Sequence, residues 1–274
     1  MALTVRTNLS AMSAYNTLGK TQSALSNTLG RISSGLRVNS ASDDAAGLGV
    51  ATKLNAQANS LEQAMRNAND GISIIQTAES ATSEVTNILS RMRELAVQSS
   101  SETLADSERA YINEEFDQLN QELDRIASVT EFNGVALADG STTTLSAQVG
   151  IDNATTSRIS ISLGDLRSTV LGVGTLNLST SAGAQTALDS IDSALDTVSS
   201  QRATLGAVQN RIDSSLSNSA NYLESLRAAE SQIMDADFAK ESTEMTKLQI
   251  MQQAGVASLA QAKNMNQAVL NLLS

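Results

Sequence analysis

The 274-residue chain contains no proline. Proline is the residue that most reliably ends or kinks a helix, because it lacks a backbone N–H and its ring clashes with the preceding turn. Aromatic residues make up only 2% of the sequence, so leucine, isoleucine, valine, methionine and alanine must supply most of the buried surface. Together these features favour long helices that pack closely side by side.

Apolar residues recur at helical spacing along most of the chain. Near the N-terminus, Leu18, Leu25 and Ile32 follow one another at intervals of seven residues. This spacing is typical of a narrow coiled-coil seam. Similar patterns predict helices over residues 1–36, 44–99, 106–128, 188–226 and 234–274.

The clearest repeat lies in the second half of the chain, where two series advance in steps of seven. One series is Leu188, Leu195, Arg202, Gln209, Leu216 and Leu223, and the other is Ile191, Val198, Leu205, Ile212, Ser219 and Leu226. A helix of this length cannot bury such a stripe alone. We therefore expect partner helices beside it.

The middle of the chain has a different character. Residues 130–183 are rich in threonine, serine and glycine, and the stretches "TLSAQV" (144–149) and "RISISL" (158–163) alternate apolar with polar residues. Such alternation predicts short strands. The expected fold class is mainly α, with long antiparallel helices and a terminal coiled coil, and with a small β-hairpin region in the middle.

The composition excludes several classes of function. The chain has no histidine and no cysteine, so the usual zinc sites and the Cys–His and Ser–His pairs of nucleophilic catalysis are not available. Its net charge of −11 argues against nucleic acid as a partner. No apolar stretch approaches the length of a transmembrane helix, so membrane insertion is not expected. We expect no catalytic residue, cofactor or metal site.

Two adjacent carboxylates, Asp43 and Asp44, precede the second predicted helix. Paired carboxylates can bind a metal or transfer protons, but the next carboxylate along the chain is Glu62. Acidic and hydroxyl side chains are also preferred where a helix begins, because they accept hydrogen bonds from its free N–H groups. The interpretation favoured here is a helix cap formed by Ser42 or Asp43.

Several long segments resemble bacterial flagellins. They are "LGRISSGLRVNSASDDAAGLGVA" (29–51), "NDGISIIQTAESATSEVTNILSRMRELAVQSS" (69–100), "EFNGVAL" (131–137), "RATLGAVQNRIDSSLSN" (202–218), "ESQIMDADFAKESTEMTKLQIMQQAGVASLAQAK" (230–263) and the final "LNLLS". The resemblance covers nearly all of residues 1–138 and 185–274. Only residues 139–184 separate the two parts, which leaves no room for the outer variable domains that many flagellins carry.

The resemblance implies a domain organisation and a function. Residues 1–43 and 234–274 would form an inner coiled-coil domain, and 44–233 a rod-like helical domain with the hairpin region at about 130–183. Many secreted copies, exported unfolded through the flagellar channel, would self-assemble outside the cell into the helical filament used for swimming. The seam residues expected to take part in assembly are Leu18, Leu25, Leu29, Ile32, Leu248, Leu259, Val269 and Leu272.

The resemblance also implies partners besides further copies of the chain. These are a flagellar export chaperone that binds residues 234–274, and the cap and hook-junction proteins. A further partner is the host Toll-like receptor for flagellin, with Arg91, Leu95 and Glu115 as candidate contacts. Two other roles remain open: a hook–filament junction protein of similar architecture, and a coiled-coil adaptor or signalling rod. An enzyme is not expected.

Overall fold

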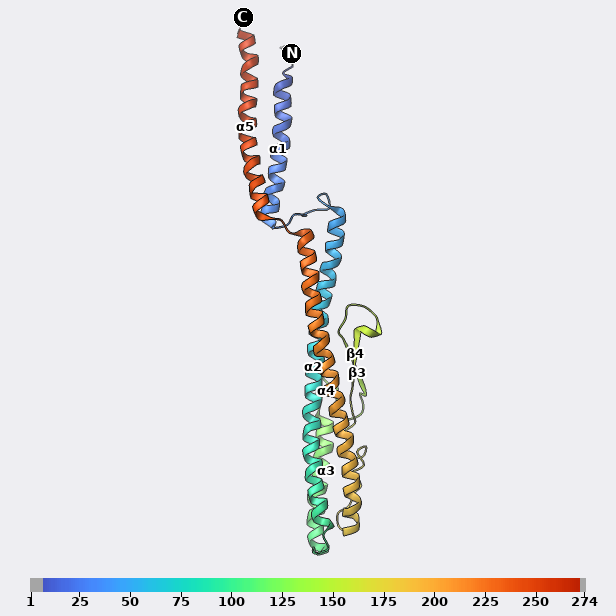
Figure 1. Ribbon diagram of the computed structural model, residues 1–274. Helices are drawn as coiled ribbons and strands as arrows, with labels where there is room; N and C mark the ends of the chain where they lie inside the picture. The colour runs from blue at the N-terminus through green and yellow to red at the C-terminus, as the bar shows by residue number, and fades with distance from the viewer. Residues whose placement is uncertain (1–6, 272–274) are drawn as a thin grey trace. The chain divides into compact units, whose positions relative to one another are not determined.

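The computed structural model describes residues 7–271, and the side chains up to residue 264. Its helices are α1 (Leu9–Ser34), α2 (Ala45–Ser100), α3 (Asp106–Val129), α4 (Ser181–Met234) and α5 (Phe238–Asn271) (Figure 1). The chain divides into two compact units, one formed by the described residues up to 57 and from 225 on, the other by residues 58–224. The predicted fold class, mainly α with a small β region, is confirmed.

In the first unit, α1 and α5 lie side by side and run antiparallel (Figure 1). The amide of Asn8 donates to the carbonyl of Ala262 at 2.9 Å. At the other end of the pair, Arg31 forms a salt bridge with Glu241 at 3.0 Å. Within the described residues, the buried side chains on these two helices are Thr21, Leu25, Thr28 and Leu248, at 1–7% exposure. The contact between α1 and α5 is therefore thin.

A glycine ends α1. Gly35 has φ 72°, a left-handed conformation that glycine adopts without strain, and its N–H donates to the carbonyl of Arg31 at 2.9 Å. The following residues pair with the connection between α4 and α5. The N–H of Arg37 donates to the carbonyl of Met234 at 2.6 Å, and that of Ala236 to the carbonyl of Gly35 at 2.9 Å. These bonds hold the two terminal segments together at one end.

The start of α2 corrects the predicted helix cap. The helix begins at Ala45, and Asp44 caps it, because its Oδ1 accepts a hydrogen bond from the N–H of Gly47 at 2.8 Å. Asp43 instead folds the preceding turn: its Oδ2 accepts from the N–H and the hydroxyl of Ser40 at 3.0 and 2.9 Å. The hydroxyl of Ser42 contacts that of Ser40 at 2.7 Å. Neither Ser42 nor Asp43 is therefore the cap.

In the second unit, α2, α3 and α4 pack around two adjoining clusters of buried side chains. The larger cluster includes Leu89, Met92 and Leu95 of α2, Phe116 and Leu123 of α3, and Ile191 and Val198 of α4. In α4 the two predicted heptad series have different environments. Ile191, Val198, Leu205 and Ile212 are at most 1% exposed, whereas Leu188, Leu195 and Leu216 are only partly buried. The series that contains Ile191 therefore faces the interior of the bundle. The series that contains Leu188 lies at the edge of this buried face.

Two small antiparallel sheets follow α3. Strands β1 (Glu131–Phe132) and β2 (Val135–Ala136) are joined by Asn133 and Gly134, whose φ values of 51° and 78° suit a tight hairpin turn. Strand β3 (Thr144–Gln148) pairs with β4 (Arg158–Ser162), with a short 3₁₀ turn (Thr155–Ser157) between them. The β3–β4 hairpin was predicted. The β1–β2 hairpin was not, although its Asn-Gly dipeptide is a known signal.

The β3–β4 hairpin packs closely on α2 and α4. Ile159 and Ile161 are 6% and 1% exposed and belong to the smaller buried cluster with Ile212 of α4. Gly71 of α2 lies beneath the hairpin, where a Cβ would come within 3.3 Å of the Cβ of Ala147 and within 3.5 Å of Cδ1 of Ile212. The hairpin is therefore part of the folded core.

Candidate assembly surfaces

Large apolar side chains are exposed on α1 and α5 although the two helices contact each other. Their exposed fractions lie between 43% and 68% for Leu9, Met12, Tyr15, Leu29, Phe238, Ile250, Met251 and Val256. A series of exposed apolar groups of this kind marks a surface that another molecule covers. We call these eight residues the terminal apolar surface.

The predicted seam residues fall into three groups. Leu25 and Leu248 are buried at 7% and 6% exposure, and Leu18, Ile32 and Leu259 are half-buried. Leu29, at 46% exposure, belongs to the terminal apolar surface. Val269 lies on α5 beyond the described side chains, and Leu272 lies outside the described residues.

Two of the three candidate receptor contacts are accessible and joined to each other. Arg91 of α2 donates to Oε1 of Glu115 on α3 from Nε at 3.0 Å and from Nη2 at 2.7 Å. It also donates to Glu94 at 2.9 Å. The hydrogen bonds that Arg91 donates to Glu115 are the main cause of the raised pKa of Arg91. The side chains of Arg91 and Glu115 remain 49% and 47% exposed.

The third candidate, Leu95, is corrected by the structure. It is 1% exposed and lies in the larger buried cluster beside Met92 and Phe116. Leu95 is one helical turn from Arg91, but the boundary between the exposed and buried faces of α2 passes between them. Leu95 therefore cannot touch a second protein while the bundle is folded.

Salt bridges join the outer edges of the bundle helices. Arg93 of α2 donates to both carboxylate oxygens of Asp192 on α4, at 2.6 and 3.2 Å. Hydrogen bonding from Arg93 lowers the pKa of the Asp192 carboxyl. Together, Arg91 and Arg93 link α2 to α3 and to α4 at neighbouring points of the bundle. The arrangement fixes how the three helices present their outer faces.

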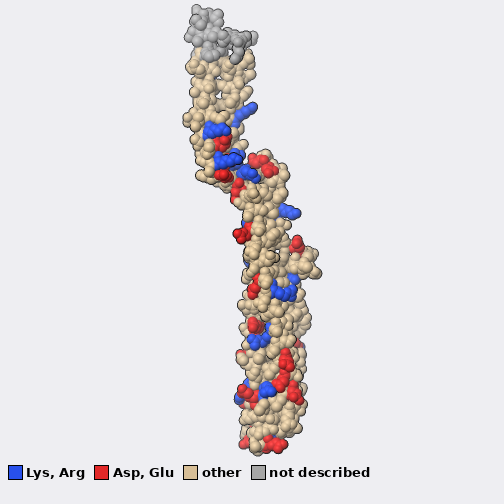
Figure 2. Space-filling view, in the orientation of Figure 1, with Lys and Arg blue, Asp and Glu red and all other residues tan. Residues whose placement is uncertain are grey.

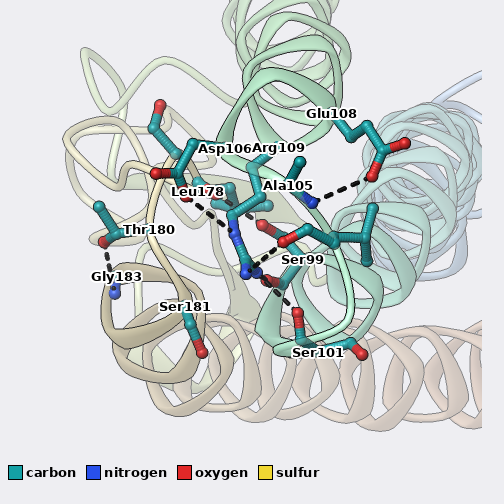
Figure 3. Close-up of polar contacts among 12 residues, drawn as sticks. Ser99, Ser101, Ala105, Asp106, Glu108, Arg109, Leu178, Thr180, Ser181 and Gly183 are labelled. Carbon is teal, nitrogen blue, oxygen red and sulfur yellow. Dashed lines mark hydrogen bonds and ion pairs between the residues drawn. The ribbon is translucent and has the colours of Figure 1, made fainter.

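A buried arginine closes the turn between α2 and α3 (Figure 3). Arg109 is 5% exposed, and its guanidinium donates to the backbone carbonyls of Ser99, of Ser101 at 2.8 Å and of Leu104 at 2.9 Å. The last carbonyls of a helix have no partner within the helix, so a cation at this end is favourable. The sequence alone gave no signal for this residue.

The start of α4 is tied to the same turn. The hydroxyl of Ser99 donates to the carbonyl of Leu178 at 2.6 Å, and that of Ser181 donates to the carbonyl of Ser100 at 2.9 Å. The side-chain oxygen of Asn113 accepts from the N–H of Leu178 at 2.7 Å. Chain segments far apart in the sequence thus meet at one end of the bundle (Figure 3).

The described part of the chain lacks two kinds of feature, a metal-binding cluster of side chains and a membrane-spanning helix. It contains no group of three or more histidine, cysteine, aspartate or glutamate side chains that could hold a metal ion. Among the described helices, none combines the length and the hydropathy that a bilayer crossing requires. The lowered pKa of Asp43 comes first from its hydrogen bond with Ser40, within the turn before α2.

Comparison with known protein families decides the identity of the chain. Residues 5–144 match the model of the bacterial flagellin N-terminal helical region, and residues 188–273 match that of the bacterial flagellin C-terminal helical region. The chain belongs to the bacterial flagellin family. The first match contains α1, α2 and α3 and ends at the first residue of β3, and the second contains most of α4 and all of α5.

Flagellins from distant bacteria align with nearly the whole chain. The flagellin of Halalkalibacterium halodurans is 45% identical over 266 residues, covering 97% of this chain and 98% of the relative. The flagellar filament 33 kDa core protein of Treponema phagedenis is 41% identical, with the same coverage. Flagellin B of Vibrio cholerae is 35% identical, and its full-length alignment needs 377 positions against 274 residues here. This chain is a flagellin without a large variable domain.

Two solved structures of flagellar proteins resemble this chain in fold. The crystal structure of Bacillus cereus flagellin is 33% identical, with a TM-score of 0.51 over 56% of this chain and 88% of that one. A putative flagellar hook-associated protein from Vibrio parahaemolyticus has a TM-score of 0.59 over 70% of this chain and 100% of that one. At 14% identity, the second likeness shows a shared fold only.

Proposed function

We propose that this flagellin is the structural subunit that self-assembles into the extracellular bacterial flagellar filament used for swimming. The observation that carries the proposal is the terminal apolar surface, on helices that the family match places at both ends of a flagellin. In water such a surface favours association with further copies. The two other roles considered, a junction protein and a coiled-coil rod, have no better support.

The same observations support the division of the chain into two domains. We assign residues 1–43 and 234–274 to the inner coiled-coil domain and 44–233 to the rod, with the hairpin region at about 130–183. The pairing of α1 with α5 supports the first assignment, and the shared core of α2, α3 and α4 supports the second. The compact units differ slightly from this division, because their boundaries fall within α2 and α4.

The limited packing between α1 and α5 also supports proposals about export and about binding to other flagellar proteins. We infer that the chain crosses the flagellar channel unfolded, that an export chaperone covers residues 234–274 beforehand, and that cap and hook-junction proteins contact the assembled subunits. Ile250, Met251 and Val256 of α5 are 62%, 43% and 53% exposed when α5 is paired only with α1. A chaperone that covers them would prevent early association.

A second proposed role, for the rod-like domain of residues 44–233, is recognition by the host Toll-like receptor for flagellin. The accessible pair Arg91–Glu115 supports it, because both side chains are about half exposed and held in a defined orientation. Leu95 is buried beneath this pair, so we propose that it supports the receptor-binding surface by packing and does not contact the receptor itself.

Polymerisation of the purified chain tests the main proposal. Concentrated monomer, precipitated gently with ammonium sulfate, should form long tubes that negative-stain electron microscopy shows. Ile250→Asp should prevent tube formation, because it places a charge in the terminal apolar surface. Val170→Asp is the matched control, since Val170 is equally exposed at 59% but lies in the loop before α4. Monomer that stays monomeric, or tubes unaffected by Ile250→Asp, would contradict the proposal.

A further inference from the structure

A shallow polar groove lies in the second unit, between the β3–β4 hairpin and α4. Its volume is about 650 Å³, and its polar lining includes Thr155, Thr156, Arg158, Asn210, Arg211 and Ser214. The charged side chains in this lining are both arginines. A basic groove is unexpected on a chain with a net charge of −11.

Neither arginine of the groove is neutralised within the described part of the chain. The guanidinium of Arg158 donates to the neutral side chains of Gln148 at 3.0 Å and Asn153 at 2.6 Å. Arg211 has no hydrogen bond or ion pair with any described residue. Asp213 is two residues further along α4, so it points away from Arg211 around the helix. The groove therefore offers positive charge and hydroxyl groups to a partner.

A surface of opposite charge lies on α3 of the same unit. The helix contains seven acidic residues and two arginines, of which Arg109 is buried and Arg125 is bound to Glu122 at 2.6 Å. Tyr111 is 80% exposed, and the exposed Glu114 follows it one turn later. Glu114 accepts a hydrogen bond from the neutral amide of Gln118 at 3.3 Å. In Figure 2, acidic side chains are spread over the visible face of the second unit, with basic side chains between them.

We propose that the outer face of α3 of one copy docks into the basic groove of a second copy, with Glu114 bound to Arg211. This inference rests on the proposed filament function, and it identifies two surfaces through which neighbouring copies bind each other in the filament. Tyr111 adds apolar contact beside the ion pair, and aromatic residues commonly anchor such interfaces. Charge complementarity selects a second copy as the occupant, because each chain carries both surfaces.

The position of the two surfaces explains why the contact extends into a fibre. Glu115 binds Arg91, and Arg93 binds Asp192 of α4, so the middle of α3 lies level with residue 192. Arg211 is 19 residues further along α4, which is about 28 Å at 1.5 Å per residue. Two copies that dock in this way are shifted along the bundle by about that distance. Contacts between two different surfaces, with such a shift, form open helical fibres rather than closed dimers.

Charge reversal tests the contact. Arg211→Glu and Glu114→Arg should each raise the critical concentration for polymerisation by about tenfold, the size of effect expected when like charges face each other. The double variant should return it to within about threefold of the unsubstituted chain. Arg211→Lys, which keeps the charge, is the matched control. Circular dichroism melting curves check that every variant is folded.

Cross-linking tests the same geometry independently of stability. The chain contains no cysteine, so the double variant Gln118→Cys with Ser214→Cys can form disulfides only between introduced thiols. Oxidation of polymer with copper phenanthroline should give a ladder of covalent oligomers, and each single variant should give dimers at most.

The outcomes separate this contact from the proposed function. Tubes that are indifferent to both charge reversals, a double variant that is not restored, or the absence of a ladder would overturn the contact and leave the filament role intact. An unsubstituted chain that forms no tubes would overturn both.

Discussion

Arg109 of α3 donates a hydrogen bond of 2.8 Å to the carbonyl oxygen of Ser101, which lies just beyond the end of α2. The same guanidinium bonds two further carbonyls, and it is only 5% exposed. A buried cation thus closes the turn between α2 and α3, the two helices that the Arg91–Glu115 salt bridge also joins. The position of α3 relative to the end of α2 is therefore held by this turn.

Removal of that cation should destabilise the second unit. Arg109→Ala leaves the carbonyls of Ser99, Ser101 and Leu104 without their side-chain donor, and a buried polar group without a partner costs about 1–3 kcal/mol. We expect a loss of roughly 3 kcal/mol in the free energy of unfolding, measured by urea denaturation. Arg125→Ala removes an exposed ion pair with Glu122 that solvent screens, so its loss of stability should be much smaller. Equal losses would contradict the proposed role of Arg109.

Gly71 and Gly206 both lie within helices and should respond differently to substitution. Nothing lies within 4 Å of a Cβ at Gly206, so Gly206→Ala should stabilise the fold by about 0.5–1 kcal/mol through helix propensity. At Gly71 the hairpin is in the way, and Gly71→Leu should cost about 1–3 kcal/mol through overpacking. Thermal unfolding measures both. A Gly71→Leu variant as stable as the parent would show that the hairpin does not pack on α2.

The salt bridge between Arg93 and Asp192 gives the fold an acid sensitivity of known sign. Hydrogen bonding from Arg93 holds the pKa of Asp192 below its ordinary value of 3.8. A carboxyl with a lowered folded-state pKa stabilises the fold above its unfolded-state pKa. That contribution is lost as the pH falls through the folded-state pKa. The free energy of unfolding should therefore decrease as the pH falls below about 4, and Asp192→Asn should lessen this decrease.

Urea unfolding of parent and variant at about pH 6 and pH 2.5 measures the difference. Asp196→Asn is the control, because Asp196 is one turn further along α4 and has no ion pair within the described residues. If the free energy of unfolding depends on pH in the same way in the parent and in Asp192→Asn, then this salt bridge does not cause the acid sensitivity.

The terminal helices should be much less protected from solvent than the bundle. Within the described residues, the pair of α1 and α5 buries Leu25 and Leu248 among few others, whereas α4 buries Val198, Leu205 and Ile212 almost completely. Local unfolding requires less free energy where few apolar contacts are lost. Backbone amides of α1 and α5 in the monomer should exchange with deuterium at least about a hundredfold faster than those around Leu205. In the filament this difference should shrink, and unchanged exchange on assembly would contradict burial of the terminal apolar surface.

Much of this fold could be predicted from local patterns. The absence of proline and the seven-residue spacing of Ile191, Val198, Leu205 and Ile212 identify a long helix and its buried face, because helical geometry depends on near neighbours in the chain. Alternation predicted β3 and β4 for the same reason. Family resemblance, rather than periodicity, supplied the function.

Contacts between distant segments could not be predicted in this way. No local pattern indicates that Arg109 lies under the carbonyls at the end of α2, since that depends on how α3 folds back. Leu95 was misjudged because a match to a surface motif does not reveal which side of α2 faces the core. The cap was misplaced by one residue because Asp43 and Asp44 are chemically equivalent, and only the preceding turn decides which of them meets the helix.

Substitution of Arg91 and Leu95 should separate surface from core in the proposed receptor recognition. Arg91→Ala removes an exposed guanidinium and its bonds to Glu115 and Glu94, so the melting temperature should change little. Leu95→Ala opens a cavity at a side chain that is 1% exposed and should cost about 2–5 kcal/mol. Reporter cells that carry the flagellin-sensing Toll-like receptor measure activation, and thermal unfolding measures stability.

We expect Arg91→Ala to lower activation by monomer at a temperature where its fold is intact, because the lost group belongs to the contact itself. Leu95→Ala should lower activation only as far as its unfolding does, and should recover when the cells are assayed at a lower temperature. Leu95→Met, which keeps most of the volume, should behave like the parent in both measurements. If Leu95→Met loses activation while its melting temperature is unchanged, then Leu95 reaches the receptor directly. In that case α2 must rotate or open on binding, since its folded packing hides this side chain.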